Sequence, residues 1–294
     1  MTENNKNQPV SDIDRREFVA FSVATGLAAT AASAAAQGQV VETNVEIKTP
    51  DGTCDAAYIH PATGSHPGVL LWSDAFGLRS VTREMAKRLA AAGYSVLVPN
   101  PFYRLSKAPF TDASTFNFQN QADMAKLRPM MASVNAPGAA EKDAIAYVAF
   151  LDAQKEVDKS KKIGTQGYCM GGPLIMKTAA TLPNRIGAAA SFHGGGLVGN
   201  DANSPHLLAP KIKARMYIGI AANDDATQPD AKDKLKAAFA AAKVNAEIEV
   251  YAGAQHGWCM RDMPKQANGE PIYNMADAER AWGKLLALYK AGIA

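Results

Sequence analysis

The chain has 294 residues, of which 47% are hydrophobic and 20% are charged, and its formal net charge at pH 7 is +3. That length and apolar content are enough for one large hydrophobic core, and a single α/β domain often reaches this size. Positive and negative charges are interspersed, without a basic block or an aromatic ladder, so the composition does not indicate nucleic-acid binding.

The first 36 residues have the pattern of an export signal. Paired arginines, Arg15 and Arg16, are followed two places later by an apolar residue, and an alanine-rich apolar segment runs over about 21–31. Small residues at 32–36 offer a cleavage site. An ordinary amphipathic N-terminal helix is the alternative. The apolar segment is too short and too rich in alanine for a stable membrane anchor.

We therefore expect the twin-arginine export machinery to recognise residues 1–36, leaving residues 37–294 as a periplasmic or secreted protein. The three cysteines, Cys54, Cys169 and Cys259, form neither a disulfide framework nor a zinc-binding pattern. The chain also lacks a glycine-rich nucleotide-binding motif. The sequence thus predicts no metal and no cofactor.

Strands and helices are expected to alternate along the rest of the chain. Apolar runs and turn signals predict strands at 40–48, 54–60, 69–72, 95–99, 162–167, 186–192, 214–221 and 246–251. Helical spacing is predicted at 81–92, 139–154, 173–182, 230–242 and 275–291. The alternation predicts a single α/β domain, a mostly parallel sheet with helices on both faces. Residues 100–136 are irregular and proline-rich, which is typical of a lid or helical flap.

The segment Gly167-Tyr168-Cys169-Met170-Gly171-Gly172 lies between a predicted strand and a predicted helix. A reactive side chain flanked by glycines at such a turn is typical of a nucleophile elbow. Cysteine attacks only as the thiolate, so it needs a base or a positive field nearby. The N-terminus of the following helix supplies part of that field.

A base and a carboxylate follow in the order that this architecture requires. His256 lies in the loop after the last predicted strand, and Asp224 and Asp225 lie in the loop after the strand before it. The order cysteine, aspartate, histidine is that of α/β-hydrolases, in which the carboxylate orients the imidazole.

From Val40 onward the chain resembles the dienelactone hydrolase family (carboxymethylenebutenolidase-like α/β-hydrolases). The Gly-Tyr-Cys-x-Gly-Gly elbow of the family matches residues 167–172. Its acid, followed four positions later by proline, matches Asp225 and Pro229, so the resemblance favours Asp225 over Asp224. Its histidine, three places after a glycine, matches His256.

The resemblance implies further site residues. The family has a carboxylate after its first buried strand that contacts the resting thiol, and Asp74 stands at that position, one methylene shorter than the usual glutamate. The backbone N–H groups of Ala75 and Met170 would form the oxyanion hole. Two family arginines that hold a substrate carboxylate have no matched positions, and the candidates are Arg79, Arg104 and Arg261.

The implied activity is cleavage of a small lactone or ester. Cys169 would attack the carbonyl, a thioester would form, and water activated by His256 would release the acid. One alternative is a broad-specificity carboxylesterase or thioesterase, and another is a catalytically weak binding module on the same fold. His193 and Cys259 are expected to be packing residues.

Overall fold

The computed structural model describes Met1, residues 39–266 and residues 268–294. The predicted export signal, residues 1–36, lies outside the described residues apart from Met1. The other described residues form one compact unit, Gln39–Ala294.

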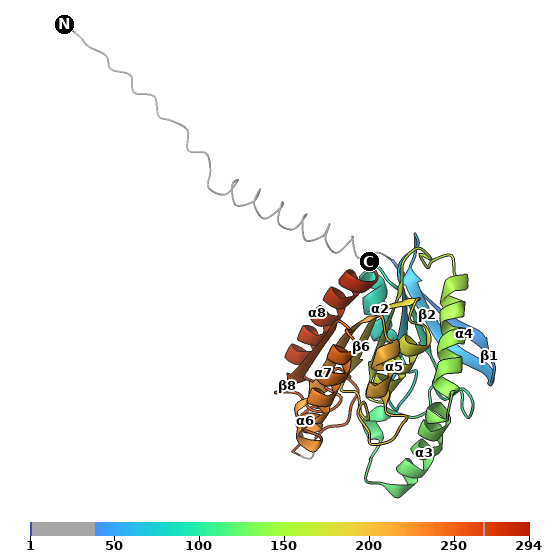
Figure 1. The fold of residues 1–294 in the computed structure, drawn as a ribbon. Coiled ribbons are helices and arrows are strands. Elements are labelled where there is room, and N and C mark those ends of the chain that lie inside the picture. The colour runs from blue at the N-terminus through green and yellow to red at the C-terminus, as the bar shows by residue number, and fades with distance from the viewer. Residues whose placement is uncertain (2–38, 267) are drawn as a thin grey trace. The chain divides into compact units, whose positions relative to one another are not determined.

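An eight-stranded sheet runs through this unit in the order β1-β2-β4-β3-β5-β6-β7-β8 (Figure 1). The strands are β1 Val40–Thr49, β2 Gly52–Pro61, β3 Gly68–Trp72, β4 Ser95–Pro99, β5 Ile163–Tyr168, β6 Ile186–Phe192, β7 Arg215–Ala221 and β8 Ala246–Tyr251. β2 pairs antiparallel with both of its neighbours, and every later pairing is parallel. The predicted strands and the predicted fold class are confirmed.

The sheet separates two hydrophobic cores, as the alternation of β3 illustrates. Leu70 and Trp72 lie in one core, whereas Val69 and Leu71 lie in the other. Successive side chains of a strand point to opposite faces, so a continuous apolar run suits a strand that is covered on both sides.

Helices cover both faces. α2 (Ser80–Ala91) and α8 (Met275–Gly292) supply apolar residues to the core that contains Val69. α4 (Ala139–Ala153), α5 (Gly171–Thr181) and α7 (Ala231–Ala241) supply them to the other. These five helices confirm those predicted.

Two further α-helices were not among the five predicted: α3 (Gln121–Asn135), within the segment expected to form a lid or helical flap, and α6 (Ala222–Thr227), in a predicted loop. 3₁₀ turns lie at Ala113–Thr115 and Pro205–Lys211. α3 begins at Asn120, whose side chain accepts hydrogen bonds from two backbone N–H groups of the first turn. It contains Pro129, a residue that normally interrupts a helix, and this hid it from the sequence pattern.

The segment containing α3 packs over the carboxyl end of the sheet through a small third core. Phe76, which follows β3, contacts Phe116 and Phe118 edge to face, with ring centroids 5.2 and 5.7 Å away. Leu127 of α3 belongs to the same cluster. The irregular segment therefore lies against the loop that follows β3, as a flap would.

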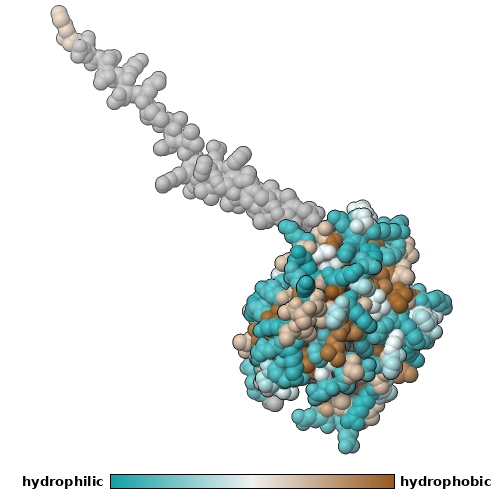
Figure 2. Space-filling model, in the orientation of Figure 1, coloured by the Kyte–Doolittle hydropathy of each residue, from teal (hydrophilic) through white to brown (hydrophobic). Residues whose placement is uncertain are grey.

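The surface visible in Figure 2 is mostly hydrophilic, with hydrophobic residues in small patches among the polar ones. Within the part of the chain that the structure describes, no helix is long and apolar enough to cross a membrane.

Candidate active site

The elbow between β5 and α5 holds Cys169 in a left-handed conformation, with φ of 51°. Such an angle is strained for a residue with a side chain and is found where a turn is fixed by its surroundings. The turn is tight because a Cβ on Gly167 would lie 2.2 Å from the carbonyl oxygen of Gly171. A Cβ on Gly171 would lie 2.7 Å from the carbonyl oxygen of Trp72. Glycine is therefore required at both positions.

Two acceptors hold the backbone N–H of Cys169. The Cys169 N–H is shared between the Phe192 carbonyl oxygen at 3.2 Å and the Nδ1 atom of His193 at 3.1 Å. The N–H groups of Ala75 and Met170 donate to no acceptor among the described residues. Ala75 lines the cavity described below, and Met170 directly follows Cys169.

His256 is paired with Asp224, and the preference for Asp225 is wrong. The Nδ1 atom of His256 lies 2.8 and 3.0 Å from the Asp224 carboxylate oxygens. Asp225 instead accepts hydrogen bonds from Lys232 Nζ at 2.7 and 2.9 Å. Both aspartates lie on α6, where consecutive side chains project about 100° apart, so only one of them can face the imidazole. The spacing to proline could not reveal that helical turn.

The surroundings of His256 favour its protonated form. Burial lowers the pKa of the imidazole, but its interactions with Asp224 and with Cys169 outweigh that effect and raise the pKa to about 10. The side-chain oxygen of Asn223 also accepts a hydrogen bond from the His256 backbone N–H, at 2.8 Å. Asp224 and Asn223 thus position both the ring and the backbone of the histidine.

Cys169 and His256 line one cavity of about 390 Å³, a size suited to a small organic ligand. It opens between the loop after β3, the elbow, and the loop after β8. The other residues around it are Asp74, Ala75, Phe76, Phe118, His193, Asn223, Gln255, Gly257, Met263, Gln266 and Ile272. No lysine or arginine is among these described lining residues. The exposed Phe118 connects the cavity to the flap.

Asp74 lines the cavity, but its carboxylate is hydrogen-bonded to Arg79. Its oxygens accept hydrogen bonds from the two Nη atoms of Arg79 at 2.6 and 2.9 Å. One of them also accepts the Phe76 backbone N–H at 3.0 Å. The hydrogen bonds of the described residues include none between Asp74 and Cys169, so the predicted thiol contact is not seen. The buried guanidinium of Arg79 compensates the carboxylate instead.

The three arginine candidates for binding a substrate carboxylate lie elsewhere. Arg79 also bonds to Asp262, at 2.7 Å from Nε and 2.9 Å from Nη2. Arg104 is held by Asp51 and Asp143. Arg261 lines a separate cavity. None of the three is among the residues that line the cavity with Cys169.

His193 is a cavity residue that sequence reasoning set aside. It is only 1% exposed, and its ring centroid lies 5.1 Å from that of His256. Because Nδ1 accepts the Cys169 N–H, the neutral ring carries its proton on Nε2, which has no hydrogen-bond partner among the described residues. Burial, and then the charge of His256, lower the pKa of His193 well below its ordinary value. The available signal was its position directly after the strand beside the elbow strand.

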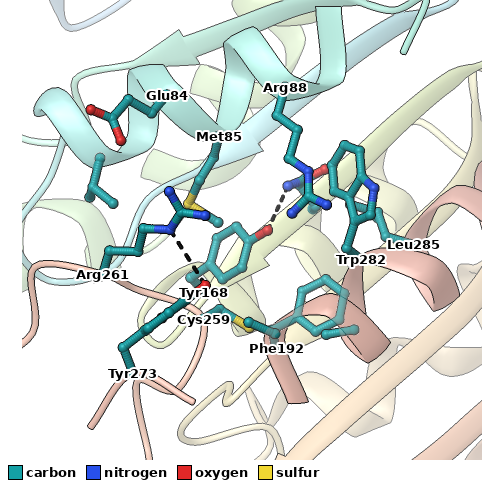
Figure 3. Close-up of a pocket in the computed structure, with 14 residues that line it drawn as sticks. Glu84, Met85, Arg88, Tyr168, Phe192, Cys259, Arg261, Tyr273, Trp282 and Leu285 are labelled. Carbon is teal, nitrogen blue, oxygen red and sulfur yellow. Dashed lines mark hydrogen bonds between the residues drawn. The ribbon is translucent and has the colours of Figure 1, made fainter. Parts of the chain in front are cut away.

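The other two cysteines lie away from Cys169. Cys54 is fully buried, and the Tyr147 hydroxyl donates to its sulfur at 3.2 Å. Cys259 lines the separate cavity that Figure 3 shows, and not the one beside Cys169. All three thiols are free.

Comparison with known proteins shows the family of this chain. Residues 54–292 match the dienelactone hydrolase family. A relative from Methylorubrum extorquens, provisionally named carboxymethylenebutenolidase, is 28% identical over 287 residues, which cover 93% of this chain and 91% of the relative. The carboxymethylenebutenolidase of Rhodococcus opacus is 26% identical over 216 residues, covering 72% and 78%.

Solved structures share the fold. One is a dienelactone hydrolase-like promiscuous phosphotriesterase from metagenomic libraries, with a TM-score of 0.71 and 23% identity over 87% of this chain and 100% of that one. Another, a dienelactone hydrolase from Anabaena variabilis, has a TM-score of 0.56 and 16% identity over 87% and 100%. The family match spans most of the chain and includes the elbow, the aspartates of α6 and His256. The chain therefore belongs to the dienelactone hydrolase family.

Proposed function

We propose that this protein hydrolyses a small ester or lactone with Cys169 as nucleophile, His256 as acid and base, and Asp224 as the residue that orients His256. The observation that carries the proposal is that Cys169 and His256 line the same cavity while Asp224 holds the far side of the imidazole. That arrangement supplies the nucleophile, the base and the orienting carboxylate that acyl transfer needs.

In the reaction that we propose, protonated His256, whose raised pKa favours the imidazolium, stands beside the attacking thiolate. The Cys169 thiolate attacks the carbonyl carbon, and the carbonyl electrons move onto oxygen. When the tetrahedral intermediate collapses, the leaving alkoxide takes the proton from the His256 imidazolium and a thioester remains. Neutral His256 then accepts a proton from water as the water attacks the thioester. Collapse of the second intermediate releases the acid and restores the thiolate and the imidazolium.

Hydrogen-bond donors around Cys169 suit the developing oxyanion. The N–H groups of Ala75 and Met170 are without acceptors among the described residues. Ala75 lines the cavity with Cys169, and Met170 directly follows Cys169 in the chain. One such donor typically contributes about 3–4 kcal/mol to catalysis. The Nε2–H of His193 is a third donor without a partner at the same cavity.

A second candidate is a carboxylesterase of broad specificity. The cavity beside Cys169 is largely apolar, and the residues described around it include no lysine or arginine. An anionic substrate such as a dienelactone would bring its carboxylate into that cavity without a lysine or arginine to pair with it. This favours neutral esters and lactones over the substrate that gives the family its name.

The test is hydrolysis of short p-nitrophenyl esters, neutral lactones and the two dienelactone isomers by the purified mature chain. Cys169→Ala should reduce ester turnover by at least about a thousandfold, whereas the matched control Cys259→Ala should retain it. A thioester of Cys169, trapped by acid quench and located by mass spectrometry, would identify the nucleophile. Turnover that survives Cys169→Ala would contradict the proposal, and a folded protein inert to every ester would favour the binding module.

Localisation is a separate proposal that rests on sequence alone. The paired Arg15 and Arg16, the apolar segment after them and the small residues at 32–36 support export through the twin-arginine machinery. Because that machinery carries folded proteins, Cys169 would reach the oxidising compartment already seated in its cavity.

A further inference from the structure

A second cavity, of about 160 Å³, lies between α2 and α8 beneath the ends of β5 and β6 (Figure 3). None of its lining residues lines the cavity beside Cys169. Its walls are mainly aromatic and aliphatic, formed by Met85, Tyr168, Phe192, Tyr273, Trp282 and Leu285. An apolar cavity of about 150 Å³ holds a molecule of the size of benzene, so one aromatic ring matches the space.

Two hydrogen-bond donors at this cavity lack acceptors. Tyr168 is 3% exposed, and its hydroxyl accepts a hydrogen bond from Gln166 Nε2 at 2.7 Å. The hydroxyl proton itself has no acceptor among the described residues. Arg261 donates only from Nε, to the Tyr273 hydroxyl at 3.4 Å, and forms no ion pair within the described part of the chain. Arg261 is exposed, and both terminal nitrogens of its guanidinium lack an acceptor among the described residues.

The other charged groups at the cavity determine which of its ends can bind an anion. Arg88 is already neutralised by Glu279, at 2.8 and 2.5 Å, and its guanidinium lies 4.2 Å from the centre of the Trp282 ring. Glu84 lines the same cavity and takes part in no ion pair of the described residues. A bound anion would therefore be held by Arg261 and repelled by Glu84.

We propose that this cavity binds a small aromatic carboxylate with a single ring, such as benzoate. The ring occupies the apolar space against Phe192 and Trp282, and the carboxylate lies at the exposed end of the cavity, where it accepts hydrogen bonds from Arg261. Figure 3 shows Tyr168 between the Arg261 and Arg88 guanidinium groups, with its hydroxyl toward Arg88. A carboxylate suits Arg261, because charge-assisted hydrogen bonds to arginine are stronger than neutral ones.

The three tryptophans of the chain allow the site to be located without any assay of hydrolysis. Trp282 lines the proposed cavity, Trp258 contacts His193 at 5.1 Å between ring centroids, and Trp72 lies in the opposite core. Titration of the ¹⁵N-labelled protein with sodium benzoate should move the indole N–H resonance of Trp282, identified with Trp282→Phe, in a saturable manner. The resonances of Trp258 and Trp72 should stay in place.

Variants test the chemistry of the interaction. Arg261→Gln should weaken benzoate binding by about tenfold or more, because it removes the charge that pairs with the carboxylate. Glu84→Gln should tighten binding, because it removes a repelling charge. Arg83→Gln, one position earlier on the same helix and outside the cavity, should leave binding unchanged. Benzamide, which has the same ring without the charge, should bind at least about tenfold more weakly than benzoate.

A second measurement uses Cys259, which lines this cavity, in the Cys169→Ala background. Since Cys54 is fully buried, Cys259 is the more accessible of the two remaining thiols, and benzoate should slow its alkylation. No saturable shift of Trp282, a shift of Trp258 instead, or equal binding of benzoate and benzamide would each overturn the proposal. Because the Cys169→Ala protein cannot use the proposed nucleophile, failure here and failure of the hydrolase proposal are distinguishable.

Discussion

Two adjacent aspartates on α6 differ entirely in their partners. Asp224 faces His256, whereas Asp225 pairs with Lys232. A neutral residue at Asp224 would leave the imidazole without the charged carboxylate that fixes its tautomer and stabilises its positive charge. The same change at Asp225 would remove only a partly exposed ion pair, of a kind that contributes at most about 1 kcal/mol to stability.

We accordingly expect Asp224→Asn to reduce kcat/KM for a p-nitrophenyl ester by roughly a thousandfold to ten-thousandfold, and Asp225→Asn to leave it within a few-fold of wild type. Nuclear magnetic resonance titration should show a lower pKa for His256 in Asp224→Asn. A severe loss in Asp225→Asn with normal activity in Asp224→Asn would restore the assignment made from the sequence.

The raised pKa of His256 also predicts how stability depends on pH. Since its pKa rises from 6.5 in the unfolded chain to about 10 in the folded one, protonation favours the folded state. The contribution is fully present below pH 6.5 and is lost as the pH rises through about 10. Urea unfolding across this range should show the stability gap between wild type and His256→Gln narrowing toward high pH. A gap that widens toward high pH would contradict the ion pair.

His193 offers two nitrogens that substitutions can separate. In His193→Asn the side-chain oxygen can replace Nδ1 as acceptor of the Cys169 N–H, while the donor at Nε2 is lost. In His193→Gln the amide can reach the Nε2 position while the bond to Cys169 is lost. If the Nε2–H stabilises bound substrate, the asparagine variant should lose about tenfold to a hundredfold in kcat/KM at nearly unchanged stability. The glutamine variant should retain the donor and lose stability instead, and the reverse pattern would exclude the role.

At the scale of elements, Arg79 at the start of α2 connects the loops on two sides of the candidate active site. It bonds to Asp74 after β3 and to Asp262 after β8. Arg79→Met should cost about 3–5 kcal/mol in the free energy of unfolding, because Asp74 would remain buried without its counter-charge. Arg83→Met, which breaks an ion pair with Glu42 at the surface, should cost less than about 1 kcal/mol. Equal costs in urea unfolding would show that Arg79 is not a buried connection.

Which elements could be predicted depended on how strong their local pattern was. The strands that are buried on both faces are nearly continuous apolar runs, and the helices on them have a clear apolar face, so both were found. α3 was hidden by Pro129, and α6 is too short to display a helical period. The elbow and His256 were found because their order and spacing are local. The choice between Asp224 and Asp225, the pairing of Asp74 with Arg79, and the partnerless Nε2 of His193 depend on contacts across the fold.

At the scale of the whole molecule, we expect export to depend on residues 1–36 and hydrolysis to depend on the folded unit. Replacing Arg15 and Arg16 with lysine should leave precursor protein in the cytoplasm, because the twin-arginine machinery reads the arginine pair. Cell fractionation and immunoblotting of the native host would measure this, with Lys6→Gln as the control outside the pair. Equal export of the double variant and the control would argue against this route, while hydrolysis by the purified domain should be unaffected.

The alternation of side chains along β5 and β6 has a consequence for engineering. Tyr168 and Cys169 are consecutive, as are Phe192 and His193, and in each pair the first residue lines the cavity under α2 and α8 while the second lines the cavity with His256. Because the two residues of each pair share a peptide bond, a substitution that moves the backbone at one cavity also moves the residue that lines the other. Laboratory evolution of substrate range should therefore randomise both residues of each pair together. When only one residue is varied, its unchanged neighbour limits which substitutions the shared backbone can accept.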